Sequence, residues 1–73
     1  MMLKCHINIF FSEEDAGYIA DVPDLRYCSA FGETPEKALA EVEVAMALWL
    51  DVARESGEQV PEPSYRPEIY QKA

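Results

Sequence analysis

Cysteine, histidine and basic residues are all scarce in this chain of 73 residues. Its two cysteines, Cys5 and Cys28, and its one histidine show no metal-ligand spacing, and a single cysteine pair is too few for a disulfide framework. The first four residues lack the apolar run of a signal peptide, and no stretch is long and apolar enough to span a bilayer. We therefore expect a cytoplasmic protein with reduced thiols, no metal, no cofactor and no membrane contact.

Positive charge is the second shortage. Six Lys and Arg residues stand against 14 Asp and Glu residues, which gives a formal net charge of −8. Nucleic-acid binding requires cationic side chains that displace counterions from phosphates, so we expect no direct contact with DNA or RNA. Two explanations of the acidity stay open: an ordinary solvated surface, or attraction of a partner that carries a basic face.

Groups that could perform catalysis are also few. His6 belongs to no catalytic motif, and Cys28 lacks the basic surroundings that activate a thiol. Asp15, Asp21 and Asp24 could be imagined as the carboxylates of a two-metal nuclease, but Asp15 and Asp24 occupy ordinary turn positions. The three glycines are isolated and form no phosphate-binding loop. The sequence therefore predicts that the protein is not an enzyme.

The first half of the sequence has the pattern of three β-strands. From Leu3 to Phe11 the odd-numbered residues are apolar, which predicts a strand with one face in the core. Residues 12–17 are mostly polar and end in glycine, as in a hairpin connection. Tyr18–Val22 is then the returning strand, and a third strand is expected from Tyr27 to Phe31.

The second half is dominated by an expected helix from Pro35 to Ser56. Thr34 is the predicted N-cap, Pro35 suits the first helical position, and Glu36 lies beside the positive end of the helix dipole. Gly57 is the predicted C-terminal cap. At 100° per residue, one broad apolar stripe forms the core face: Ala38, Leu39, Val42, Ala45, Met46, Trp49, Leu50 and Ala53.

Val44 and Leu48 lie outside that stripe, one helical turn apart. Exposed apolar residues are often incidental. A core of this size, however, rarely supplies more than about 3–5 kcal/mol, so oligomerisation or a partner subunit is the expected source of extra stability. Val44 and Leu48 are therefore candidate residues of an oligomer interface or of a surface for a partner. Trp49, in contrast, is interpreted as a core residue.

After the helix, Pro61 and Pro63 favour an extended segment, and Ser64–Tyr70 could add a short edge strand. The predicted class is α+β: a two-layer, three- to four-stranded antiparallel sheet with one long helix packed on one face, in the order β-β-β-α-β. No repeat or low-complexity tract divides the sequence. We expect residues 1–73 to form a single domain.

Several short segments occur in an order that can be compared with known protein families. They are Gly17-Tyr18-Ile19-Ala20, Val22-Pro23-Asp24-Leu25, Cys28, Gly32-Glu33-Thr34, Glu36-Lys37-Ala38-Leu39 and, after the helix, Gly57 and Val60-Pro61-Glu62-Pro63. This ordered set resembles the HicB-like antitoxins. The resemblance implies a partial ribonuclease-H-like fold and a non-catalytic protein that binds HicA, a small basic toxin that cleaves messenger RNA, and masks its catalytic site.

Two features depart from that family. Many members carry a C-terminal DNA-binding domain, whereas this sequence ends at Ala73, so no DNA-binding role is carried over. Arg26-Tyr27-Cys28 stands where the family often has Pro-Gly-Cys. The turn after the second strand is therefore expected to differ.

The leading functional hypothesis is an antitoxin-like domain that sequesters a small basic RNA-cleaving toxin of the HicA type, as a homo-oligomer. Candidate partner contacts are Glu13, Glu14 and Asp15 in the acidic connection and His6 on the exposed sheet face, chosen for charge and exposure. The alternatives are a self-associating structural or regulatory module without a toxin partner and, less favoured, a degenerate nuclease-like domain.

Overall fold

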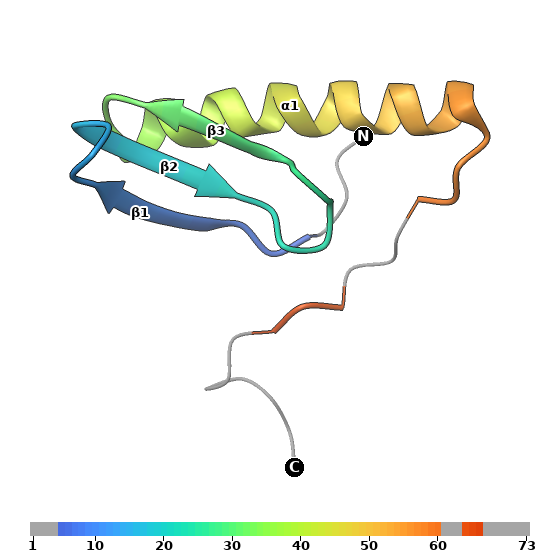
Figure 1. The fold of residues 1–73 in the computed structure, drawn as a ribbon, viewed down its shortest axis with the longest axis horizontal. Helices are drawn as coiled ribbons and strands as arrows, with labels where there is room; N and C mark the ends of the chain where they lie inside the picture. Colours follow the sequence, from blue (N-terminus) through green and yellow to red (C-terminus); the bar gives the residue numbers. More distant parts are fainter. Residues whose placement is uncertain (1–4, 61–63, 67–73) are drawn as a thin grey trace, which may run out of the picture.

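The computed structural model describes residues 5–60 and 64–66 and contains three strands and one helix in these ranges. They are β1 (Asn8–Ser12), β2 (Gly17–Asp21), β3 (Ser29–Gly32) and α1 (Pro35–Ser56). The strands form one antiparallel sheet in the order β1-β2-β3, and α1 packs along one side of it (Figure 1). This confirms the predicted α+β class.

The strand register decides which side chains share a face of the sheet. Ala20 lies opposite Ile9 in β1 and Ala30 in β3, and it is fully buried beneath α1. The next position along β2 is Ile19, which lies opposite Phe10 and Phe31. Because successive side chains alternate across a sheet, Phe10, Ile19 and Phe31 form a row on the face away from the helix.

The helix does not cover the sheet evenly. It packs mainly on β3 and β2 and only lightly on β1, which lies furthest from it (Figure 1). Ile9 and Phe11, predicted to be core residues, are consequently 38% and 54% exposed. Phe11 still packs on Tyr18, with the two ring centroids 5.3 Å apart. The first strand also begins at Asn8 rather than at Leu3, although Cys5 and Ile7 still pack against the core.

Local chemistry sets both ends of α1 as predicted. The backbone N–H of Lys37 donates to Oγ1 of Thr34 at 3.1 Å, and Pro35 occupies the first turn. At the other end Gly57 adopts φ 73°, its N–H donates to the carbonyl of Arg54, and the N–H of Glu58 donates to that of Ala53. This pair of hydrogen bonds is the Schellman arrangement that ends a helix.

Gly32, at the end of β3, lies directly against the start of the helix. A Cβ atom at this position would overlap the backbone of Lys37 and Ala38. Only glycine therefore lets β3 approach α1 closely enough to feed the chain into the Thr34 cap.

The core lies between α1, β2 and the loop that joins β2 to β3. In this loop Val22, Leu25 and Cys28 point inward and are almost completely buried. Two successive turns hold them: the N–H of Leu25 donates to the carbonyl of Val22, and that of Cys28 donates to the carbonyl of Leu25. No polar or charged side chain is buried within the described residues.

Two further predictions concern the C-terminal part and membrane contact. Residues 64–66 are not a strand, and the remainder of the predicted Ser64–Tyr70 strand lies outside the described residues. Among residues 5–60 and 64–66, no helix has the length and apolar character needed to cross a membrane.

Candidate partner-binding surfaces

The acidic connection between β1 and β2 is a tight, exposed hairpin. Glu13, Glu14 and Asp15 are all exposed. The hydroxyl of Ser12 donates to Oδ2 of Asp15 at 2.9 Å, and the N–H of Ala16 donates to the carbonyl of Glu13 at 3.3 Å. The loop therefore presents three carboxylates on a defined backbone, at one end of the sheet.

His6 does not lie with these carboxylates. It precedes β1, at the strand end opposite the hairpin, and it is half-buried rather than freely exposed. Its Nε2 lies 2.6 Å from Oδ1 of Asn8, and its ring centroid lies 4.8 Å from that of Tyr65. The structure thus separates His6 from the three acidic candidates.

Asp24 connects the loop after β2 to the chain beyond the helix. Its carboxylate accepts hydrogen bonds from the hydroxyl of Ser64 at 3.0 Å and from the backbone N–H of Tyr65 at 3.2 Å. Desolvation opposes ionisation, but these hydrogen bonds and the charge of Arg66 outweigh it and hold the pKa of Asp24 below its usual value. Asp24 is therefore explained as a structural clasp.

Burial disfavours the thiolate form of both cysteines. Desolvation raises the pKa of Cys28, and the nearby Asp21 adds to this effect. Desolvation also raises the pKa of Cys5, with a contribution from Asp24. Because the thiolate is the reactive form, both residues act as small apolar side chains. In residues 5–60 and 64–66, no three His, Cys, Asp or Glu side chains are grouped so that they could hold a metal ion.

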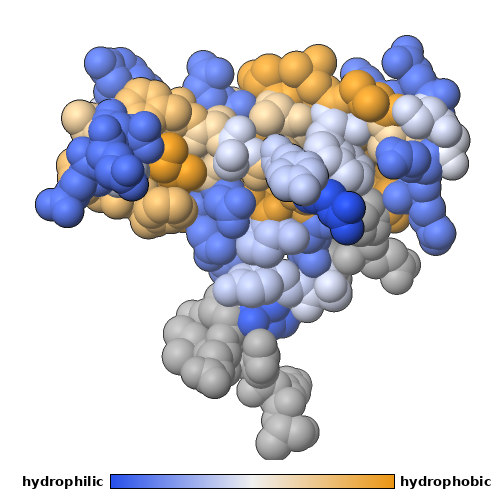
Figure 2. All heavy atoms as spheres, in the orientation of Figure 1, coloured by the Kyte–Doolittle hydropathy of each residue, from blue (hydrophilic) through white to orange (hydrophobic). Residues whose placement is uncertain are grey.

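The outer face of α1 carries a second apolar stripe. Val44, Leu48 and Val52 follow one another at four-residue spacing and are 58%, 60% and 58% exposed. Figure 2 shows apolar side chains gathered along the edge formed by α1. Glu41 and Glu55, each seven residues from Leu48, are exposed and lie on the same helical face. This outer stripe is thus an apolar surface with a carboxylate at each end.

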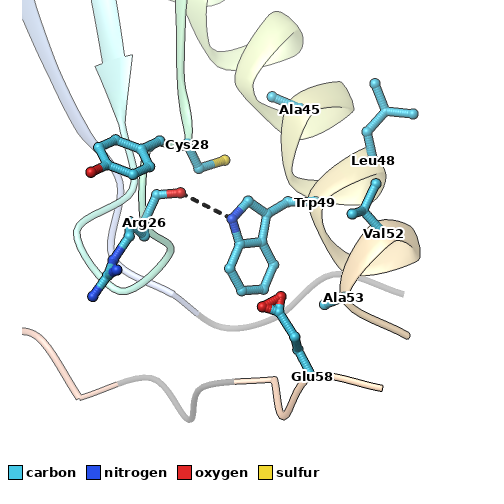
Figure 3. Close-up of a pocket in the computed structure, with 9 residues that line it drawn as sticks. Arg26, Cys28, Ala45, Leu48, Trp49, Val52, Ala53 and Glu58 are labelled. Carbon is cyan, nitrogen blue, oxygen red and sulfur yellow. Dashed lines mark hydrogen bonds between the residues drawn. The ribbon is translucent and has the colours of Figure 1, made fainter. Parts of the chain in front are cut away.

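A groove of about 450 Å³ lies between the second half of α1 and the β2–β3 loop (Figure 3). Its walls are mostly apolar and include Leu48, Val52 and Trp49 from the helix and Tyr27 from the loop. The indole N–H of Trp49 donates to the carbonyl of Arg26 at 3.0 Å, which ties the two walls together. Trp49 is therefore only partly buried: it packs against the core and also lines the groove.

Tyr27 is the most exposed large apolar residue described. Its side chain is 94% exposed, and its backbone has φ 61°, the left-handed region that glycine favours. Ala16 in the β1–β2 hairpin shares this geometry with φ 54°. A tyrosine here carries a backbone cost of about 1–2 kcal/mol that its own packing does not offset.

The open face of the sheet is the third apolar surface. Phe10 and Phe31 are about half-exposed and flank Ile19 across the three strands. The ring of Phe31 lies over Gly17, where a Cβ atom would overlap it. The neighbours on this face are mainly uncharged: Asn8, Ser12 and Ser29, together with Asp21.

The sequence interpretation found two members of the outer stripe and missed the rest of this surface. Val52 lies one turn after Leu48, so the same spacing could have revealed it. Tyr27 gave no such signal, because its exposure depends on the turn that places it. On the open sheet face, the sequence predicts that Phe31 lies in the third strand but does not show which face it occupies.

Taken together, the fold and these surfaces define a small acidic α+β protein with exposed apolar surfaces. Residues 6–73 match the model of a family described as the HicB-like antitoxin of bacterial toxin–antitoxin systems. The chain belongs to this HicB-like antitoxin family, and the role of the family is that of an antitoxin. The resemblance found in the sequence is confirmed.

One curated relative is similar over part of its length. The UPF0150 protein ssl0259 of Synechocystis sp. (strain ATCC 27184 / PCC 6803 / Kazusa) is 36% identical over 47 residues. The aligned region covers 64% of this chain and 64% of the relative, so the chain spans less than two thirds of that protein.

Proposed function

We propose that this protein is a non-catalytic antitoxin that binds a small basic RNA-cleaving toxin of the HicA type and masks its active site. The single observation that carries the proposal is the match of residues 6–73 to the antitoxin family. The formal net charge of −8 supports a basic partner, since opposite net charges accelerate association.

Long-range attraction and close contact make different contributions to such a complex. Glu13, Glu14 and Asp15 form an exposed acidic hairpin, and we assign to them the steering of the toxin during approach. Charges of this kind mainly change the association rate and its salt dependence. His6, at the other end of β1, would take part only if the bound toxin extends along the strand.

Co-expression tests the proposal directly. The small basic protein encoded beside the gene for this chain is induced alone or together with the chain, and growth is recorded. We expect growth arrest from the toxin alone and recovery with the chain. In a pull-down, an inactive toxin variant should be retained by the chain. Growth arrest that persists with a well-expressed chain, together with no retention, would contradict the proposal.

A second candidate function is self-association without a toxin. The exposed Val44 and Leu48 motivate it, because a small core often depends on a second copy for support. Sedimentation of the purified chain at micromolar concentration distinguishes the two. A stable monomer would remove the support for this candidate.

A further inference from the structure

We propose that the outer stripe of α1 and the adjoining groove, with Tyr27 at its rim, form the surface on which the toxin docks. The toxin would present an apolar ridge with cationic side chains beside it. This inference rests on the proposed function and adds to it the site of close contact. The acidic hairpin at the end of the sheet would then steer the toxin without being the main contact.

The arrangement of charge along the outer stripe favours a basic partner over a second copy. Glu41 and Glu55 lie symmetrically about Leu48, seven residues away on either side. If two copies packed antiparallel with Leu48 against Leu48, Glu41 of each copy would face Glu55 of the other. Parallel packing would place each Glu beside its own counterpart. Like charges in contact destabilise both arrangements.

The nearby Lys37 does not remove this repulsion between like charges. Lys37, one turn before Glu41, already contacts Glu33, with Nζ and Oε1 separated by 3.4 Å. Asp51, on the flank of the stripe near Leu48, is exposed, and its Oδ1 lies 3.9 Å from a guanidinium nitrogen of Arg54, which is a long ion pair. The stripe therefore keeps an acidic border, and Lys or Arg side chains beside an apolar ridge would complement it.

Tyr27 provides a second and independent observation. The loop accepts a left-handed backbone at a tyrosine whose side chain is almost fully exposed. Strained residues of this kind persist where the surrounding structure holds them, and they are concentrated at functional sites. Tyrosine is also enriched among the residues that dominate binding energy. Tyr27 lines the same groove as Leu48 and Val52, so the loop and the helix both contribute to the proposed contact surface.

The groove supplies the pocket that such a contact needs. Trp49 forms part of its wall, held by the hydrogen bond to Arg26, so the wall is already in place before a partner arrives (Figure 3). Glu58 lies at the groove on the helix side and adds a carboxylate to those of the stripe, while Arg26 contributes a cation on the loop side. One apolar side chain of the toxin can enter here while a neighbouring cation meets Glu55 or Glu58.

The open sheet face is less complementary to a basic partner than the outer stripe is. Phe31 already covers Gly17, and most neighbours of the row Phe10, Ile19 and Phe31 are uncharged. This face serves as the comparison in the test. Phe10→Thr replaces a half-exposed aromatic residue of β1 with a residue that also favours strands.

The experiment measures the affinity of the chain for the inactive toxin variant. Leu48→Gln and Tyr27→Gly should each raise Kd at least tenfold, and the double variant more. Leu48→Gln keeps a residue that favours helices, and Tyr27→Gly suits the left-handed backbone, so both variants should remain folded by circular dichroism. Phe10→Thr should change Kd less than twofold.

The outcomes separate this inference from the proposed function. If the wild-type chain binds the toxin and Leu48→Gln and Tyr27→Gly bind equally well, the inference is wrong and the antitoxin function stands. Weaker binding by Phe10→Thr alone would assign the contact to the sheet face and likewise overturn it. A wild-type chain that does not bind the toxin, but forms a dimer that Leu48→Gln dissociates, would reject both and assign the stripe to a second copy.

Discussion

The two apolar stripes of α1 have the same spacing, but one is buried and the other is exposed. The inner stripe is buried against the sheet and its loop, and its members are Ala38, Val42, Met46, Leu50 and Ala53. The outer stripe, Val44, Leu48 and Val52, remains more than half exposed. Spacing alone therefore shows that a helix has an apolar face, whereas the second layer of the fold decides which face is used. The fold buries the inner stripe and leaves the outer one exposed.

The largest expected effect distinguishes the two stripes by stability. Met46→Ala removes a side chain that is 1% exposed and should lower the free energy of unfolding by about 2–5 kcal/mol. Leu48→Ala, two residues along the same helix, should change it by less than about 1 kcal/mol. Urea unfolding followed by circular dichroism measures both. Equal losses would mean that the outer stripe is also buried in solution, and hence that the chain self-associates.

Trp49 lies at the border between the two stripes. Trp49→Phe keeps an aromatic ring but removes the N–H that donates to the carbonyl of Arg26. We expect a loss of about 1 kcal/mol in unfolding free energy, because the exposed carbonyl can find water instead. Circular dichroism is the suitable probe, since the chain has one tryptophan. A loss as large as that of Met46→Ala would place Trp49 with the inner stripe.

Features set by local chemistry were predictable from the sequence. Thr34, Pro35 and Gly57 act through hydrogen bonds and backbone angles within a few residues of their own position. The sequence therefore predicts the same helix bounds, Pro35 and Ser56, that the structure shows. The same holds for the antiparallel pairing of β1 and β2, which a short polar hairpin joins.

Features set by packing between layers were not predictable. The exposure of Ile9 and Phe11 depends on how α1 lies across the sheet, nearer to β3 than to β1. The burial of Leu25 depends on two successive turns that give the loop a three-residue period, which matches neither a strand nor a helix. For the proposed docking surface, sequence spacing predicts that Val44 and Leu48 lie outside the core face of the helix. It does not predict that Tyr27 lines a groove together with Leu48.

The third prediction compares the two left-handed residues of the sheet loops. Tyr27→Gly and Ala16→Gly should both leave the unfolding free energy unchanged or raise it by up to about 1 kcal/mol. Relief of strain is partly offset by the greater freedom of glycine in the unfolded chain. Urea unfolding again provides the measurement. A loss of stability in Tyr27→Gly alone would show that the Tyr27 side chain supports the fold, which would weaken its assignment to the outer contact surface.

The smallest expected effect concerns Asp24, whose exposed hydrogen bonds to Ser64 and Tyr65 hold the chain after α1 against the β2–β3 loop. Because its pKa is lowered in the folded state, the clasp is complete above the ordinary carboxyl value of about 3.9 and is lost as the pH falls through the lower, folded value. The backbone amide resonance of Tyr65 should therefore titrate below pH 4, while circular dichroism of α1 identifies any global unfolding. In Asp24→Ala, the Tyr65 amide should show the chemical shift of the released segment at every pH. If the amide of Tyr65 instead responds well above pH 4, another group holds this segment. The chain beyond α1 would then be attached by contacts other than those of Asp24.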